Sequence, residues 1–207
     1  MAYRPTKATE AARREREAAL LSAARGIVAD AGFASASVKA IAEAAGVSAG
    51  TVYTYFGSRD ELLAEVFRAA AGRELDEVRR AVAAAGQAPG RGRAQREISA
   101  LVGTFARRAL AGRTLAWALL IEPAGELIDA ERLAHRRAYA QEMEAIVTRG
   151  IEARELPEQD PRIVGPGLIG LISEALTGPL SPEGAVPAAH LISGVTDMCL
   201  RAVGGAQ

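Results

Sequence analysis

The chain has 207 residues, with 49% hydrophobic residues and 25 Lys and Arg balanced by 25 Asp and Glu. This is enough apolar material for one or two globular domains and argues against a disordered protein. The lone cysteine, Cys199, excludes a disulfide framework or a cysteine-based metal cage within one chain. The N-terminus is charged, without an apolar signal region, and no later run approaches 18 apolar residues, so we expect a cytoplasmic protein without a membrane contact.

Ala, Leu, Arg and Glu are abundant while aromatic residues make up 4% of the chain, a composition that favours helices over strands. We therefore predict an all-α fold. Charge is uneven along the chain, because residues 1–59 hold eight Lys and Arg against five Asp and Glu, a net charge of +3. Such a basic end is compatible with nucleic acid but is weak evidence alone.

The first predicted helix runs from about Arg13 to Asp30 and ends at Gly32. Ser37 is suited to cap a second, shorter helix that ends at Gly46. The third begins at Ser48 and stops before Gly57, and an S-x-x-E capping box at residues 58–61 opens a long fourth helix. A Gly- and Pro-containing connector at 83–95 precedes helices at about 96–111, 113–121, 127–154, 161–178 and 187–203.

The stretch "SVKAIAEAAGVSAGTVYTYF", residues 37–56, meets the requirements of a helix-turn-helix. Ala42 permits a close helix crossing, and the two valines at 47 and 52 fill the space beside Ile41. On the third helix Tyr55 and Phe56 share the inward face with Val52. Thr51, Tyr53 and Thr54 then face outward, where their hydroxyl and methyl groups are suited to DNA phosphates and base edges.

Together with "AARGIVADAGF" before it and "GSRDELL" after it, this stretch resembles the DNA-binding domain of the TetR family of bacterial transcriptional repressors. The resemblance covers about fifty residues. It implies a helical homodimer that binds double-stranded operator DNA, with one N-terminal three-helix head per subunit and a C-terminal domain for dimerisation and for a small effector. We therefore expect no enzyme activity and no cofactor. Over the C-terminal two-thirds, the resemblance rests only on length and helix count.

The resemblance implies a flexible arm at 1–12, a helix-turn-helix DNA-binding domain at 13–58, a connecting helix at 59–82 and a helical effector-binding and dimerisation domain at 83–207. It makes Lys39 a base or phosphate contact and Arg59 a phosphate contact. Family members often carry a long polar side chain at the position of Ala49, so base readout here is expected to be sparse and DNA shape to matter more. The predicted DNA-binding residues are Ser37, Lys39, Ser48, Ala49, Thr51, Tyr53, Thr54 and Arg59.

Two C-terminal sites are predicted from apolar residues. An effector cavity, for a small and largely hydrophobic molecule of unknown identity, is expected to be lined by Phe105, Trp117, Leu120, Tyr139, Met143, Ile146 and Val147, although these side chains could equally fill the core. His135 and Arg136 are near enough in sequence to orient a polar group. The last two helices are predicted to form the dimer interface through Gly167, Leu168, Ile172, Leu176, Leu191, Val195 and Met198.

Two motifs indicate other functions. "GPGLIG", residues 165–170, satisfies the G-x-G-x-x-G fingerprint of dinucleotide folds and leaves a dinucleotide-dependent enzyme as the alternative. However, no strand pattern precedes it, and Pro166 lies inside it, so close helix packing at Gly167 and Gly170 is preferred. Glu131 and His135 have the i, i+4 spacing of a helical metal pair, but a third ligand is not evident, and no metal site is predicted.

Overall fold

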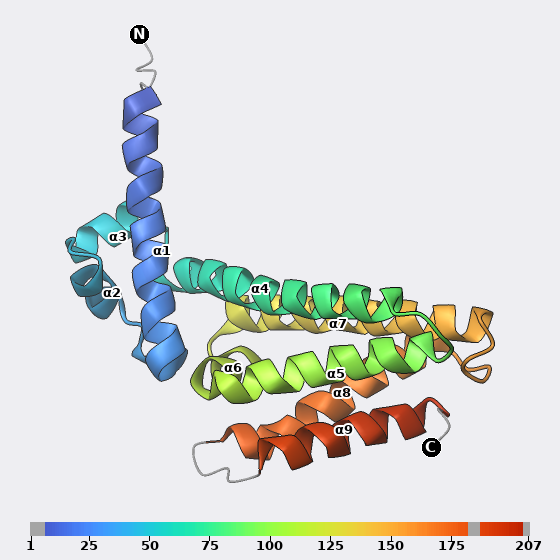
Figure 1. The fold of residues 1–207 in the computed structure, drawn as a ribbon. Coiled ribbons are helices and arrows are strands. Elements are labelled where there is room, and N and C mark those ends of the chain that lie inside the picture. Colours follow the sequence, from blue (N-terminus) through green and yellow to red (C-terminus); the bar gives the residue numbers. More distant parts are fainter. Residues whose placement is uncertain (1–6, 182–186, 205–207) are drawn as a thin grey trace.

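The computed structural model describes residues 7–181 and 187–204, which form nine α-helices and no strand (Figure 1). The all-α prediction is therefore confirmed. The helices are α1 (Lys7–Ser35), α2 (Val38–Ala44), α3 (Ala49–Tyr55), α4 (Arg59–Gln87), α5 (Arg93–Ala111), α6 (Arg113–Leu120), α7 (Glu126–Glu152), α8 (Pro161–Leu180) and α9 (Ala188–Ala202).

A small head and a longer helical bundle share α4. Figure 1 shows α1, α2 and α3 gathered at one end, with α1 projecting beyond them, while α4 runs from the head along α7 and α5. The first half of α4 contributes Leu63, Val66 and Phe67 to the head core, and its second half contributes Val78 and Val82 to the bundle core. Helix α4 is therefore the continuous element that joins the two regions.

Most predicted helix ends agree with the structure. Ser37, Ser48 and Ser58 each accept a backbone N–H three residues ahead, as the capping patterns predict. Inside α1, the backbone of Gly32 is not helical (φ 78°, ψ 176°), so the predicted break is present. The connector is shorter than predicted, because α4 continues through residues 83–87.

The beginning of α1 differs from the predicted flexible arm. Residues 7–12 belong to the helix, while residues 1–6 lie outside the described part of the chain. The division of the chain at 12, 58 and 82 stays a prediction.

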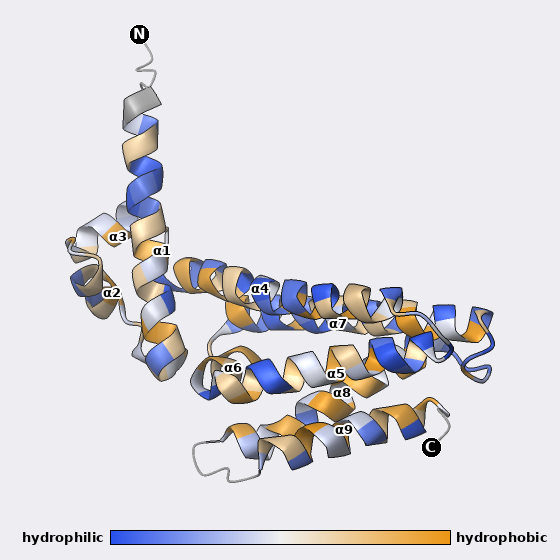
Figure 2. Ribbon diagram, in the orientation of Figure 1, coloured by the Kyte–Doolittle hydropathy of each residue, from blue (hydrophilic) through white to orange (hydrophobic). Residues whose placement is uncertain are grey.

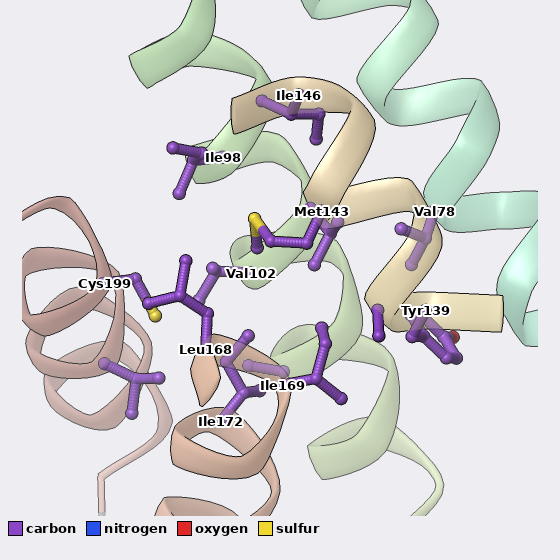
Figure 3. Packing of buried hydrophobic residues seen from close by; sticks show 14 of the residues in the cluster. Val78, Ile98, Val102, Tyr139, Met143, Ile146, Leu168, Ile169, Ile172 and Cys199 are labelled. Carbon is purple, nitrogen blue, oxygen red and sulfur yellow. The ribbon is translucent and has the colours of Figure 1, made fainter. Parts of the chain in front are cut away.

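The bundle core lies where α4, α5, α7, α8 and α9 meet. Figure 3 shows Met143 on α7 directed toward this core, with Val102 on α5, Leu168 on α8 and Cys199 on α9 around it. At Gly165 a side chain would meet the Ala140 carbonyl oxygen at 2.9 Å, so a glycine is needed where α7 and α8 cross. The predicted close approach at Gly167 and Gly170 is wrong for this chain alone, since an added Cβ there meets nothing within 4 Å.

Helix α8 is the one helix in the described ranges that is long and apolar enough to cross a membrane, with a mean hydropathy of 1.4. We expected from the sequence that no segment would be long and apolar enough for this, and α8 corrects that expectation. One such helix is weak evidence, because core helices of water-soluble proteins pass the same test. Figure 2 shows hydrophobic, orange segments on α8 and α9, with hydrophilic segments between them on α9. The side chains that α8 buries in this fold belong to Leu168, Ile169, Ile172, Leu176 and Leu180.

Candidate DNA-binding surface and effector cavity

The outward face of α3 carries the predicted DNA-binding hydroxyl groups. Tyr53 is 56% exposed and Thr54 is exposed, whereas Val52 is buried in the head core. Ser48 Oγ accepts the N–H of Thr51 at 3.2 Å and lies 2.9 Å from its hydroxyl group. These contacts fix the start of the short helix, and they leave Tyr53 and Thr54 on a surface that a groove of DNA could receive.

Lys39 on α2 extends into solvent, and its weak ion pair with Glu43, at 3.9 Å, leaves the ammonium group accessible. Ser37 begins the same helix, and its hydroxyl oxygen accepts the N–H of Ala40 at 3.1 Å. Ala49 is exposed at the first position of α3 and offers no hydrogen-bonding group. The exposed polar groups of α2 and α3 are therefore few.

Arg59 is half-buried, and its guanidinium group is directed toward the backbone of the head. Its guanidinium group donates to the carbonyl oxygens of Phe33, at 2.6 Å, and Ala36, at 2.8 Å. A third contact, with Asp60, is 3.4 Å long. Arg59 therefore fixes the turn between α1 and α2, and this structural role was not predicted from its position beside a capping serine.

Sequence reasoning also missed two arginines on the projecting part of α1. Arg13 and Arg16 are exposed and line a groove together with Thr54 and Tyr55 of α3. Their basic character contributes to the charge excess of the N-terminal segment. Only the fold reveals that they lie beside α3.

A cavity of about 330 Å³ lies within the bundle, among residues of α4 to α8. Three of the predicted residues, Phe105, Leu120 and Tyr139, are on its wall, as are His135 and Arg136. Met143, Ile146 and Val147 are not, because they face the bundle core, where each is at most 1% exposed. Trp117 packs against that core and does not reach the wall. The wall residues not predicted are Glu74, Val78, Arg108, Ala109, Ala111, Gly112, Leu115, Ala116, Leu119, Arg132, Ile169 and Ser173.

Aromatic rings and paired charges form the polar part of the wall. The rings of Phe105 and His135 each meet that of Tyr139 edge to face, with centroids 5.2 and 5.0 Å away. Burial, assisted by the charge of Arg79, lowers the pKa of His135 to about 4, so its imidazole is neutral at neutral pH. Arg108 donates to both carboxylate oxygens of Glu74, at 2.5 and 3.0 Å.

The segment after α6 joins the cavity to the head. Arg132, on the cavity wall, donates to the carbonyl oxygens of Leu119 at 2.9 Å and of Glu122 at 2.7 Å. The Glu122 carboxylate accepts the N–H groups of Phe33 at 2.9 Å and Ala34 at 2.8 Å. Glycine suits position 32, because its φ is 78° and a Cβ there would lie 2.6 Å from Glu122 Oε2 and displace this carboxylate.

The residues of the dinucleotide fingerprint and of the candidate metal pair have other surroundings than those functions require. The GPGLIG stretch lies wholly within α8, so the strand, loop and helix of a dinucleotide fingerprint are not formed there. The Glu131 carboxylate pairs with Arg68 at 2.5 Å, while His135 contacts the ring of Phe67. Across the described parts of the chain, no group of three or more His, Cys, Asp or Glu side chains is arranged to hold a metal ion.

The predicted dimer residues divide into two sets. Leu168, Ile172, Leu176 and Val195 are at most 3% exposed within the single chain, so they are not available to a partner. The helical period correctly predicted the apolar faces of α8 and α9, but these faces pack within the subunit. Gly167 and Met198 are exposed, and Leu191 is half-buried. The same surface includes Ile163, which is 72% exposed.

Residues 20–66 match the model of a family described as bacterial regulatory proteins of the tetR family. These residues include the helix-turn-helix and the capped start of α4. The head is a TetR-family domain. The resemblance stated from the sequence is thereby confirmed. No curated protein matches the chain in sequence.

Solved structures extend the fold comparison beyond this head. The chain is 22% identical to the fatty acid degradation regulator FadR of Bacillus halodurans, with a TM-score of 0.73 over 89% of this chain and 94% of that one. FadR of Bacillus subtilis, solved with stearoyl-CoA, is 20% identical, with a TM-score of 0.74 over 92% and 99%. RolR, solved with resorcinol, is 18% identical, with a TM-score of 0.70 over 95% and 91%. At these identities the comparison establishes a shared fold.

Proposed function

We propose that this protein is a cytoplasmic transcriptional repressor that binds an inverted-repeat operator as a homodimer and is released by a small hydrophobic effector. The main support for this proposal is the exposed face of α3, which lies in the segment that matches the TetR family. On this helix Tyr53 and Thr54 face outward, and Val52 is buried. Lys39 and Thr51 are the proposed base contacts. Arg13 and Arg16, beside α3, are proposed phosphate contacts in addition to Arg59.

A dimer is proposed because α3 is only seven residues long and can reach few base pairs. Two copies related by a two-fold axis read an inverted repeat and double the contacted sequence. The proposed interface is the outer surface of α8 and α9. Gly167 and Gly194 leave space for a close approach there, and Met198 and Ile163 are exposed apolar side chains.

The cavity supports an effector-binding role. Its volume of about 330 Å³ is within the usual range of small-molecule sites, and its wall is largely apolar. Two proteins of the same fold were solved with small molecules, stearoyl-CoA in one and resorcinol in the other. These two compounds differ greatly in size, so they support ligand binding by the fold without naming the ligand of this chain.

The contacts after α6 support a route from this cavity to the DNA-binding surface. Leu119 belongs both to the cavity wall and to the head core. A ligand that moves α6 therefore acts on the head through Leu119 and through the hydrogen bonds of Glu122 with the α1–α2 turn. Such a ligand releases DNA only if it binds the DNA-incompetent arrangement more tightly than the competent one.

The test is a selection of bound sequences from random double-stranded DNA with the full chain. An inverted repeat is expected, and Thr51→Ala or Lys39→Ala should alter the preference at specific base pairs by about 1–3 kcal/mol. Glu158→Ala, on an exposed loop, is the matched control and should leave the selected sequence unchanged. Recovery of no preferred sequence would contradict the proposal.

A further inference from the structure

The cavity wall contains the buried hydroxyl group of Tyr139. Tyr139 is 3% exposed, and its Oη has no hydrogen-bond partner in the described residues. The neighbouring rings of Phe105 and His135 hold the tyrosine ring edge to face. A buried polar group without a hydrogen bond is unfavourable, and most such groups in proteins are satisfied. A bound molecule with an acceptor atom would supply the missing partner.

Two of the three arginines on this wall, Arg108 and Arg132, are already paired, although the Arg108 side chain is 40% exposed. Arg108 is paired with Glu74 through two hydrogen bonds, and Arg132 donates to backbone carbonyl oxygens of α6 and of Glu122. His135, desolvated between Phe67 and Tyr139, is neutral. An ionised ligand would lose its hydration here without gaining an unpaired opposite charge.

One cation on the wall remains accessible to an anion. Arg136 is exposed, so it lies at the rim, where water screens its charge. An anionic group held there would stay outside the apolar part of the cavity. The interior therefore favours a neutral molecule, and its ring-lined side favours a flat one.

We infer that the cavity binds an uncharged, ring-containing apolar molecule with one hydrogen-bond acceptor, which accepts the Tyr139 hydroxyl proton. This inference rests on the effector cavity of the proposed function and specifies the chemical class of its ligand. The acceptor can be a carbonyl, ether or phenol oxygen, because each offers a lone pair to a hydroxyl donor. Tyr139 is then the residue that distinguishes a polar ring compound from a hydrocarbon of the same size.

Three naphthalene probes of similar shape test this inference by calorimetric titration of the full chain. The probes are 2-acetonaphthone, with a neutral acceptor, 2-ethylnaphthalene, without an acceptor, and 2-naphthoate, which is anionic. We expect 2-acetonaphthone to bind about tenfold more tightly than either of the others, as a hydrogen bond to an otherwise unsatisfied buried group predicts. This comparison requires no variant, so it is informative even if substitutions disturb folding.

Tyr139→Phe removes only the hydroxyl group. It should weaken 2-acetonaphthone binding by about fivefold to tenfold and leave 2-ethylnaphthalene within about twofold. Thr148→Val, which removes an exposed hydroxyl group on the same helix away from the cavity, is the control and should change neither. An equal loss for both probes would indicate a purely structural role for the hydroxyl group and overturn the inference.

Tightest binding of 2-naphthoate, or no binding of any probe, would also overturn it. These failures are distinct from failure of the proposed function. The selection of DNA sequences tests the head without any ligand, whereas the probe series tests the cavity without DNA. A chain that selects an inverted repeat but prefers 2-naphthoate would retain the DNA-binding proposal and lose this one.

Discussion

The head and the bundle begin their helices in different ways. In the head and at its junction with α4, Ser37, Ser48 and Ser58 each satisfy a backbone N–H three residues away. In the bundle, only α8 has such a cap, where Asp160 accepts the N–H of Arg162, whereas α5, α6, α7 and α9 begin without a hydrogen bond to an N-cap side chain. Glu155 instead accepts the N–H groups of Gly92 and Ala94 at the start of α5, which lowers its pKa.

The helices of the head and those of the bundle are stabilised by different kinds of contact. Helices of seven residues are unstable alone, so α2 and α3 depend on local caps and on the small core around Ile41, Val52 and Phe56. The bundle depends on burial of long apolar faces, and some of its ion pairs, such as Arg79–Glu142 and Arg108–Glu74, link residues far apart in sequence. Substitutions should therefore act through burial in the bundle and through hydrogen bonds in the head and its junction.

The largest expected effect concerns burial on α8. Ile172→Asp places an unpaired carboxylate in the bundle core, where Ile172 is 1% exposed, and should destabilise the chain by at least about 4 kcal/mol. Met198→Asp, at a side chain 45% exposed, should leave the monomer fold intact and weaken the proposed dimer. Urea unfolding and light scattering measure these effects. A folded, soluble Ile172→Asp variant would contradict the assignment of its side chain to the core.

The next effect concerns the junction. Glu122→Ala removes the two hydrogen bonds to Phe33 and Ala34 and should lower the free energy of unfolding by about 2–3 kcal/mol, because both involve a charged acceptor. Faster hydrogen exchange at these two amides would locate the loss. Glu158→Ala, without such contacts, should change stability by less than about 0.5 kcal/mol. Unchanged exchange at Phe33 and Ala34 would show that the junction does not depend on Glu122.

A smaller effect is expected from pH. The pKa of His135 is about 4 in the fold against 6.5 in an unperturbed chain, so the unfolded state binds more protons between these values. The contribution of the neutral imidazole to the free energy of unfolding is fully present above pH 6.5. It is lost as the pH falls toward 4, and the loss is about 2 kcal/mol after allowance for partial exposure. His135→Gln should flatten this part of the profile. Parallel profiles for the variant and the unmutated chain would refute the assignment.

The smallest effect separates two arginines of the head. Arg16→Ala should reduce the slope of log affinity for DNA against log salt by about one and leave thermal stability unchanged, as expected for one phosphate contact. Arg59→Ala should lower the unfolding temperature, because its hydrogen bonds to Phe33 and Ala36 hold the α1–α2 turn. If Arg59→Ala changes only the salt slope, its predicted phosphate role is the dominant one.

Local chemistry explains why the head was predictable. Ser37, Ser48, Gly46 and Gly57 mark the helix ends within a few residues of where they act, and Val52 and Phe56 follow from the helical period. The inward position of Phe56 and the outward position of Tyr53 were both predicted. Arg59 was the exception, because its partners Phe33 and Ala36 are more than twenty residues away.

The C-terminal sites were less predictable because several apolar faces have the same period. The sequence pattern made Met143, Ile146 and Val147 as good candidates for the cavity wall as Phe105 and Tyr139. Only Phe105 and Tyr139 reach the cavity. Likewise, Leu168 and Ile172 have the pattern of an interface but pack within the chain. Periodicity identifies an apolar face, whereas the arrangement of neighbouring helices decides what that face contacts.

The sequence by itself determined the all-α class, the helix ends and the position of the helix-turn-helix, since each depends on contacts within about four residues. Only the tertiary structure decided which side chains form the cavity, that the Tyr139 hydroxyl has no partner in the described part of the chain, and that Glu122 holds the α1–α2 turn. The physical reason is distance along the chain. Glu122 is 89 residues from Phe33, and no local rule relates residues so far apart.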